Sequence, residues 1–599
     1  MEGMPDGEAG QMEKRSEQII IGTSDFSKLR RSGGYYVDKT RFIRSIMNDT
    51  GETSLYTRPR RFGKTLMMSA IRAFLEMDYS NPGDETAARE LFSGLAILED
   101  EAFCREHLAK WPVIHLSLKD AEGESFTESA ENLRHILCEC AKRHRLLAFS
   151  EKVLPEDRED IRCLLDLDKT PLEEALPLMR RSVALLEKAL HVHFGRRVIV
   201  LIDEYDVPFN KARVNGHYKS TQQLLRMILS QALKDNPDLE KAIVTGCLRL
   251  ARESVFTGLD QFVCNGVSSV ENAAAFGFTS EEARGVLEDF GLESLEEEAR
   301  AHYDGYRFGG LEIFCPWDLM NFCAKTAVNG GRPVFDNFWI NTSGNEIVNE
   351  FIEESDEPRL ALLKPMLAGG AVEAAVKDDL SFDELEKTHS SDMLLSLLWT
   401  TGYLTKIGDA PDGKAVLRIP NREVRECFER RIETCFSAAN PRYVESSCAL
   451  ADAFISGRIN DCIKAVSRVL RRSVSVRDAG AESFYHGLML GMLSAASVAR
   501  DENGRIVIAD LASNREAGDG YSDIAFCDTD RTVGVVIELK RTESMNARDL
   551  MNRCREAMRQ IEARKYWEIF EGTGIGTVRM YGIAFSGKDC RMMLETRSL

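Results

Sequence analysis

The loop Arg58–Thr65, with the sequence Arg-Pro-Arg-Arg-Phe-Gly-Lys-Thr, constrains the fold of this chain more than any other segment. The stretch Ser54–Thr57 before it has the pattern of a short strand, and the apolar stretch Leu66–Leu75 after it has the pattern of a helix. A Gly-Lys-Thr sequence between a strand and a helix is typical of a phosphate-binding loop, because the helix N-terminus presents amides to an anion. The chain is therefore predicted to contain an α/β domain.

Further apolar strands and amphipathic helices alternate along the first half of the chain. Strands are expected at Val113–Leu118, Val198–Ile202 and Ala242–Thr245, and a long helix at Leu172–Phe194. The β-branched run from Val198 is typical of a central parallel strand with both faces covered. This order predicts an N-terminal doubly wound parallel-sheet domain of the phosphate-loop type.

The length of 599 residues exceeds what one hydrophobic core supports. We expect a disordered lead-in over residues 1–18 and the phosphate-loop domain over residues 19–277. A mostly helical middle region is expected over residues 278–470, with a β-hairpin near 402–421, and a third domain over residues 471–599. No repeat or low-complexity linker separates these regions, so the predicted boundaries are soft by tens of residues.

The composition excludes several classes of protein. Hydrophobic residues make up 44% and charged residues 29%, as in ordinary soluble proteins. No stretch approaches the ~20 apolar residues of a membrane helix, and the acidic N-terminus lacks the apolar run of a signal peptide. The 15 cysteines form no CxxC pair, which argues against structural zinc and fits a reducing cytoplasm. The net charge of −19 argues against simple non-specific DNA binding but allows a local basic groove.

The phosphate loop predicts specific contacts with a nucleotide. Lys64 would reach the β- and γ-phosphates and Thr65 would bind Mg²⁺. The amides expected to surround phosphate oxygens are those of Arg61, Phe62, Gly63 and Lys64. Arg58 stands where the usual pattern has its first glycine, so the loop alone is a weak signal, and a structural basic turn is the alternative.

Polar residues follow two of the expected buried strands. Asp203 would hold the Mg²⁺ shell, and Glu204 would orient or activate the attacking water. Solvated loop acids or a helix cap are the alternative. Thr245 could sense the γ-phosphate. Arg249 or Arg252 could be a phosphate sensor or an arginine finger across a subunit interface, or else a surface arginine.

A second set of charged residues lies near the C-terminus. Phosphodiester cleavage uses a hard divalent cation held by carboxylates, and a lysine near the developing charge helps. Glu538 and Lys540 are two apart on an apolar strand and therefore share one face. A hairpin turning at Asp528–Arg531 would bring Asp523 beside Glu538. This pattern predicts a metal-dependent nuclease site; a solvated strand and an inactive fold are the alternatives.

Several of these segments together resemble the AAA-ATPase-like family of bacterial and archaeal proteins, whose members typically carry a C-terminal PD-(D/E)XK nuclease domain. The resemblance covers nearly the whole chain, and in that family the arginine at position 58 is usual. The segments that carry it are Phe26–Leu29, Tyr35–Thr40, Arg58–Thr65, Asp203–Asp206, Thr245–Gly246, Glu253–Leu259, Tyr303–Tyr306 and Trp339–Ser343.

The resemblance implies further roles and a restriction-endonuclease-like fold for the C-terminal domain. Ser522-Asp523 replaces the family's Pro-Asp element. Glu482 matches an extra acidic metal ligand of the first helix, Gln560 a glutamine that supports the site, and Glu516 is either a further ligand or a loop acid. The implied cofactors are ATP and Mg²⁺, with Mn²⁺ as an alternative at the nuclease site. The implied partners are nucleic acid, DNA above RNA, and further copies of the chain, by analogy with ring-forming ATPases.

Three functions are compatible with these residues. The favoured hypothesis is an ATP-hydrolysing protein that cleaves nucleic acid under nucleotide control. The alternative is a nucleotide-dependent switch whose C-terminal domain binds nucleic acid or a partner without cleaving. A small-molecule kinase is disfavoured by the large helical middle region and the C-terminal carboxylate–lysine set. A row of Arg548, Arg555 and Arg559 could follow a phosphate backbone, but a solvated helix face is preferred.

Overall fold

The computed structural model describes residues 18–250, 262–339, 365–367, 369–380, 391–429, 441–473, 482–498, 508–517, 520–542, 544, 546–587 and 589–599. Contacts between Cα atoms divide the chain into two compact units, one with residues 1–348 and 373–423 and the other with residues 349–372 and 424–599. The predicted boundaries after residues 277 and 470 do not coincide with this division. Apart from residue 18, the predicted lead-in lies outside the described residues.

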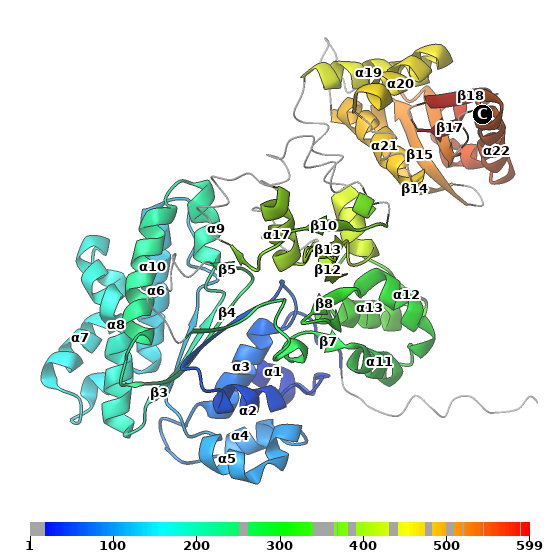
Figure 1. Cartoon of the computed structure of the whole chain (residues 1–599). Helices are drawn as coiled ribbons and strands as arrows, with labels where there is room; N and C mark the ends of the chain where they lie inside the picture. The colour runs from blue at the N-terminus through cyan, green and yellow to red at the C-terminus, as the bar shows by residue number, and fades with distance from the viewer. Residues whose placement is uncertain are drawn as a thin grey trace, which may run out of the picture. The chain divides into compact units, whose positions relative to one another are not determined.

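The first unit is built on a five-stranded parallel sheet (Figure 1). In spatial order its strands are β2 (Val113–Ser117), β3 (Val198–Asp203), β4 (Leu239–Gly246), β1 (Thr53–Thr57) and β6 (Phe262–Asn265). Strand β3 is buried at every position, as expected for a parallel strand covered on both faces. The predicted parallel α/β domain is therefore confirmed, and the carboxyl ends of β1, β3 and β4 meet at one edge of the sheet.

Helices surround this sheet. They are α1 (Phe26–Arg31), α2 (Arg41–Asn48), α3 (Lys64–Leu75), α4 (Thr86–Leu91), α5 (Glu101–His107), α6 (Phe126–Arg143), α7 (Pro155–Leu165), α8 (Leu172–Phe194), α9 (Val207–Val214) and α10 (Tyr218–Leu233). Helix α8 has its predicted range and ends at Gly195, whose φ of 70° is the left-handed conformation that suits glycine. Helices α6, α7, α8 and α10 pack together beside β3 (Figure 1).

A smaller helical part with its own sheet follows in the first unit. It contains β7 (Phe278–Thr279), α11 (Ser280–Asp289), α12 (Glu296–Tyr303), β8 (Tyr306–Phe308), β9 (Leu311–Phe314) and α13 (Pro316–Val328). The three strands form one antiparallel sheet in the order β7-β9-β8. The sequence-based prediction of a helical region missed the hairpin β8–β9. Gly309 and Gly310 have positive φ values of 54° and 87°, which a two-residue hairpin turn favours.

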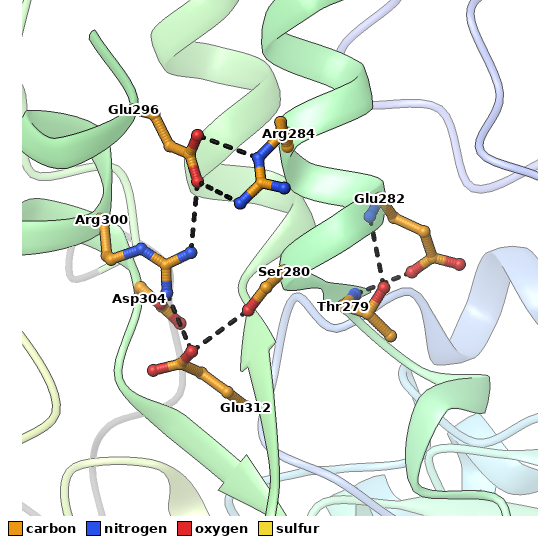
Figure 2. A network of polar contacts seen from close by, with 8 residues as sticks. All are labelled: Thr279, Ser280, Glu282, Arg284, Glu296, Arg300, Asp304 and Glu312. Atoms are coloured by element: carbon orange, nitrogen blue, oxygen red, sulfur yellow. Dashed lines mark hydrogen bonds and ion pairs between the residues drawn. The ribbon is translucent and has the colours of Figure 1, made fainter. Parts of the chain in front are cut away.

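A network of caps and ion pairs holds these elements together (Figure 2). At the start of α11, Thr279 and Glu282 form a capping box in which each side chain accepts a hydrogen bond from the other residue's amide. Arg300 of α12 donates to Glu312 of β9 at 2.9 Å. Lys39 donates to Glu282 and so ties the N-terminal segment before α2 to α11.

Further elements of this stretch are β5 (Arg249–Leu250), β10 (Val372–Ala374), β11 (Asp379–Leu380), α17 (Ser391–Thr401), β12 (Thr405–Asp409) and β13 (Ala415–Arg418). Strands β12 and β13 pair antiparallel, which confirms the hairpin predicted near 402–421. Strand β5 pairs with β11 in parallel.

The second unit has a five-stranded mixed sheet in the order β14-β15-β16-β17-β18. Strands β16 and β17 are parallel and joined by a crossover helix, and the other pairs are antiparallel. The unit's elements are α19 (Pro441–Ser456), α20 (Ile459–Ser473), α21 (Glu482–Val498), β14 (Ile508–Ala517), β15 (Gly520–Asp528), β16 (Val533–Arg541), α22 (Ala547–Ala563), β17 (Thr577–Ser586) and β18 (Asp589–Ser598). The predicted helix–strand–strand–strand–helix–strand order is confirmed, and β18 is an additional edge strand.

Alternate strand residues of the second unit pack on opposite faces of the sheet. Ile524 and Ile537 face the core formed with α19, α20 and α21. Ala525 and Val536 face the core formed with α22 and the short helix after it. The period of two therefore also places Asp523 and Glu538 on the α22 face. Among the described helices, none is long and apolar enough to cross a membrane.

Candidate functional site

The phosphate loop joins β1 to α3 in the first unit. Helix α3 begins at Lys64, and its N-cap Gly63 has a φ of 85°, a left-handed conformation that glycine adopts without strain. Arg61 also has a positive φ, of 69°. Gly63 has no side chain that could cap this helix, so it leaves the first amides of α3 facing outward, as an anion site requires.

Arg58, at the position of the usual first glycine, is a structural anchor. Its side chain is fully buried, and its guanidinium donates to the carbonyls of Asn265 (2.8 Å) and Gly266 (2.7 Å) at the end of β6. The Cζ atom of this guanidinium lies 5.1 Å from the ring centroid of Phe308. Burial lowers the pKa of Arg58 to about 10, which leaves it charged at neutral pH. The arginine thus fixes the loop to the neighbouring strand instead of binding a ligand.

Lys64 is held inside the loop. Its Nζ atom donates to the carbonyls of Arg58 (2.8 Å) and Pro59 (2.9 Å) and lies 3.6 Å from the sulfur of Cys247. The ammonium is therefore oriented toward the concave side of the loop. A phosphate group bound there would take the place of the carbonyls as its partner and would form a stronger, ionic hydrogen bond.

Asp203 and Thr245 are neighbours at the ends of β3 and β4. The register pairs Ile202 with Val244, and the Thr245 hydroxyl donates to Oδ1 of Asp203, which also accepts from the Glu204 amide at 3.0 Å. In the described part of the chain, Oδ2 of this fully buried aspartate has no hydrogen-bond partner. A bare carboxylate oxygen is costly inside a protein, so the residue fits a hard cation such as Mg²⁺.

Glu204 has a strained backbone with a φ of 55° and lines the cavity in front of the loop. Burial raises the pKa of its carboxyl, the nearby Asp203 raises it further, and Lys64 opposes the change. A raised pKa makes a carboxylate a better acceptor for a proton. Asp206 instead accepts from the Leu248 amide at 2.9 Å and ties the end of β4 to the turn after β3.

A cavity of about 770 Å³ lies against the loop, within the usual range of ligand pockets. Its wall includes Arg60, Glu204, Asn210, Cys247 and, from α13, Trp317. Five predicted nucleotide-binding residues also line it: Arg61, Phe62, Gly63, Lys64 and Thr65. The ring of Phe62 packs against aromatic residues of β8, so only its backbone is free to serve a phosphate.

Arg249 lies elsewhere. It belongs to β5, and its guanidinium is 3.6 Å from the carboxylate of Asp378. It does not line the cavity. Its predicted role as a phosphate sensor therefore remains a prediction, and Arg252 lies outside the described residues, as does the motif Glu253–Leu259.

The second site is set by strand register in the C-terminal unit. Ile524 of β15 pairs with Ile537 of β16, which places Asp523 opposite Glu538. Oδ2 of Asp523 accepts from the Leu539 amide at 2.7 Å, and Nζ of Lys540 lies 2.8 Å from Oε1 of Glu538. Glu538 is buried, and Lys540 is nearly so. Two adjacent carboxylates with a lysine form a donor set that fits a divalent cation.

Side chains from neighbouring helices surround this pair. Gln560 of α22 donates to the hydroxyl of Tyr566 at 3.1 Å, and the Tyr566 pKa is raised by burial and by the charges of Glu538 and Asp523. His486 of α21 lies 2.9 Å from the carbonyl oxygen of Asp523. Tyr566 and His486 were missed as site residues, although Tyr566 follows Gln560 and His486 follows Glu482 by a few positions.

The side chains of Glu482 and Glu516 lie outside the described residues, although their backbones belong to α21 and β14. Their predicted metal-binding roles remain predictions. Residues of the first unit that sequence reasoning missed are Arg60, Asn210, Cys247 and Trp317, which line the cavity. Only Arg60 carried a signal, because it lies within the phosphate loop itself.

Two family matches cover these regions. Residues 20–256 match an AAA-ATPase-like family described as "Predicted AAA-ATPase", and residues 480–595 match the PD-(D/E)XK nuclease superfamily. A protein of Azotobacter chroococcum mcd 1, described as an uncharacterized protein in the vnfD 5' region, is 26% identical over 413 residues, which is 68% of each chain. The matches confirm the resemblance and the two fold types predicted from the sequence.

Proposed function

We propose that this chain, whose two ends match an ATPase-like family and a nuclease superfamily, hydrolyses ATP and cleaves nucleic acid under nucleotide control. DNA is the proposed substrate, the cytoplasm the proposed location, and a homo-oligomer the proposed state. The observation that carries the proposal is the pairing of Asp523 with Glu538 and Lys540 on one face of adjacent strands.

The nucleotide would bind in the cavity of the first unit. Lys64 and the loop amides would hold its phosphates, and Thr65 and Asp203 would hold Mg²⁺. When bound, the metal would neutralise phosphate charge. Glu204 would accept the proton of the attacking water, and the support for this role is its place on the cavity wall and its raised pKa.

The nuclease site would use the residues of β15 and β16. Asp523 and Glu538 would hold the divalent cation, Mg²⁺ or Mn²⁺, which would polarise the scissile phosphate when bound. Lys540 would stabilise negative charge that develops on the phosphate oxygens. Its close contact with Glu538 supports this role, because it keeps the ammonium beside the carboxylate pair.

The proposal is tested by incubating the full chain with labelled single- and double-stranded DNA and RNA, with Mg²⁺, Mn²⁺ or EDTA. Cleavage by the wild type that is lost in Glu538→Gln and in EDTA is the expected result. The matched control is Glu556→Gln, an exposed glutamate of α22 that pairs with Arg553. If the chain binds nucleic acid in a way that changes with nucleotide but cleaves no substrate, the proposed nuclease is wrong and the nucleotide-dependent switch takes its place.

A further inference from the structure

Two adjacent arginines of the phosphate loop have different surroundings. Arg61 is exposed, and its guanidinium lies 4.2 Å from the ring centroid of Trp317. Arg60 is half-buried and lines the cavity together with Lys64, Glu204 and Cys247. The side chain of Arg60 interacts electrostatically with Cys247, Asp206 and Glu204. Arg61 lines the same cavity and also interacts with Glu204, but its guanidinium lies over the ring of Trp317. The two positions are therefore not interchangeable.

The peptide that carries Arg60 is fixed on both sides. Lys64 donates to the carbonyl of Pro59, the residue before it, at 2.9 Å. The indole nitrogen of Trp339 donates to the carbonyl of Arg60 itself at 3.1 Å. Since Lys64 also lies 3.6 Å from the sulfur of Cys247, the ammonium, the thiol and the Arg60 side chain form one cluster at the cavity wall. The Arg60 side chain therefore extends from a backbone position that the Trp339 indole holds beside the cavity.

The proposed hydrolysis develops charge at this wall. The water oxygen forms a bond to the γ-phosphorus, and the bond from that phosphorus to the β–γ bridging oxygen breaks. The electron pair of that bond remains on ADP, and the water proton passes to the Glu204 carboxylate. Negative charge grows on the bridging oxygen and on the phosphoryl oxygens. A positioned arginine at this place accelerates such reactions by about 10³- to 10⁵-fold.

We propose that Arg60 is a catalytic residue that supplies this positive charge within the same chain. The inference rests on the proposed ATP hydrolysis at the same cavity. Arg249, the candidate predicted from the sequence, is paired with Asp378 and does not line the cavity. Arg61 does line it, but its guanidinium lies over the Trp317 ring. Hydrolysis would then need no arginine from a second copy, and its rate per chain would not depend on protein concentration.

The test compares full-length wild type with Arg60→Ala and Arg60→Lys, with Arg89→Gln as the control. Arg89 is a surface arginine of α4 that pairs with Glu85 and Glu101. ATP affinity, steady-state hydrolysis and trapping of ADP with aluminium fluoride are measured, with and without added guanidinium ion. Thermal unfolding confirms that each variant is folded.

The expected result for Arg60→Ala is a kcat lower by about 10³-fold, loss of aluminium fluoride trapping, and an ATP affinity close to that of the wild type. Guanidinium ion restores part of the rate in this variant and none in the control. Arg60→Lys stays slow because lysine lacks the planar two-pronged donor. Adding Lys64→Ala protein, which keeps Arg60, does not restore hydrolysis to Arg60→Ala.

Two results would overturn the assignment while leaving the proposed function intact. One is an Arg60→Ala protein that hydrolyses ATP as fast as the wild type. The other is a loss of hydrolysis that guanidinium ion does not repair while trapping persists, which would assign Arg60 a structural role. A wild type that binds no nucleotide or hydrolyses none would instead remove the proposed function, and this inference with it.

Discussion

The two candidate sites are assembled in different ways. The cavity of the first unit is formed by segments far apart in the sequence, including Arg60, Glu204, Cys247 and Trp317. The carboxylate pair of the second unit comes from two consecutive strands joined by a short turn. Strand register alone therefore brings the two carboxylates together, whereas the cavity depends on tertiary packing.

The positively charged side chains of the two sites also have different partners. In the phosphate loop, Arg58 and Lys64 donate hydrogen bonds to backbone carbonyls. In the other site, Lys540 pairs directly with Glu538. We therefore expect changes in the first unit to affect loop structure and nucleotide binding, and changes in the second to affect cleavage.

The largest expected effect comes from placing at position 58 the glycine of the general phosphate-loop pattern. Arg58→Gly would leave a cavity and remove the bonds to the carbonyls of Asn265 and Gly266. We expect a loss of about 3–5 kcal/mol in the free energy of unfolding of the first unit. Chemical denaturation followed by tryptophan fluorescence measures this loss. A variant as stable as the wild type would show that the arginine does not anchor the loop.

Lys64→Ala is expected to weaken ATP binding by about 100-fold, or about 2.7 kcal/mol. Nuclease activity without nucleotide should be unchanged, since Lys64 and Glu538 belong to different units. Calorimetric titration with ATP and a cleavage assay measure the two effects. Equal losses of both activities would contradict the separation of the sites.

Asp304 gives the first unit a stability that depends on pH. Burial raises the pKa of this aspartate from 3.8 to about 6, with a smaller contribution from Glu312, while Arg300 opposes the shift. The folded state thus holds the proton more tightly than the unfolded state, so this contribution is full below about pH 4 and is lost as the pH rises through 6. The free energy of unfolding of Asp304→Asn, relative to that of the wild type, should rise by up to about 2 kcal/mol between pH 4 and 7. Urea denaturation of both proteins at several pH values measures this change. A difference in unfolding free energy that does not vary with pH would show that Asp304 does not have the raised pKa.

The smallest expected effect concerns the second site. Tyr566→Phe removes the hydroxyl that accepts a hydrogen bond from Gln560. We expect a loss of about 1 kcal/mol in stability and a cleavage rate lower by a few fold. ATP hydrolysis serves as the internal control, because it should not change. A drop in both activities would point to unfolding of the chain instead of a local effect at the second site.

The elements predicted best from the sequence are those with strong periodic patterns. Helix α8 has the predicted range, since its apolar residues repeat at helical spacing over more than twenty positions. Asp523 and Glu538 were predicted to be neighbours because a hairpin and a period of two determine their positions. Asp203 beside Thr245 follows from the pairing of β3 with β4.

Other features depend on contacts between distant segments and had no local signal. Trp317 lies more than 250 positions after Arg61 in the sequence, yet the two side chains stack. The burial of Arg58 depends on the carbonyls at the end of β6. Strand β18 is an edge strand with charged residues such as Arg591 and Glu595, so its sequence lacks the apolar character of the inner strands.

Nucleotide at the first site is proposed to control cleavage at the second. The most direct measurement is the initial rate of cleavage of labelled DNA by wild type and Lys64→Ala, each with and without saturating ATP. We predict a rate that changes at least about tenfold with ATP in the wild type and not at all in Lys64→Ala. Cleavage by the wild type at the same rate with and without ATP would contradict nucleotide control of the nuclease.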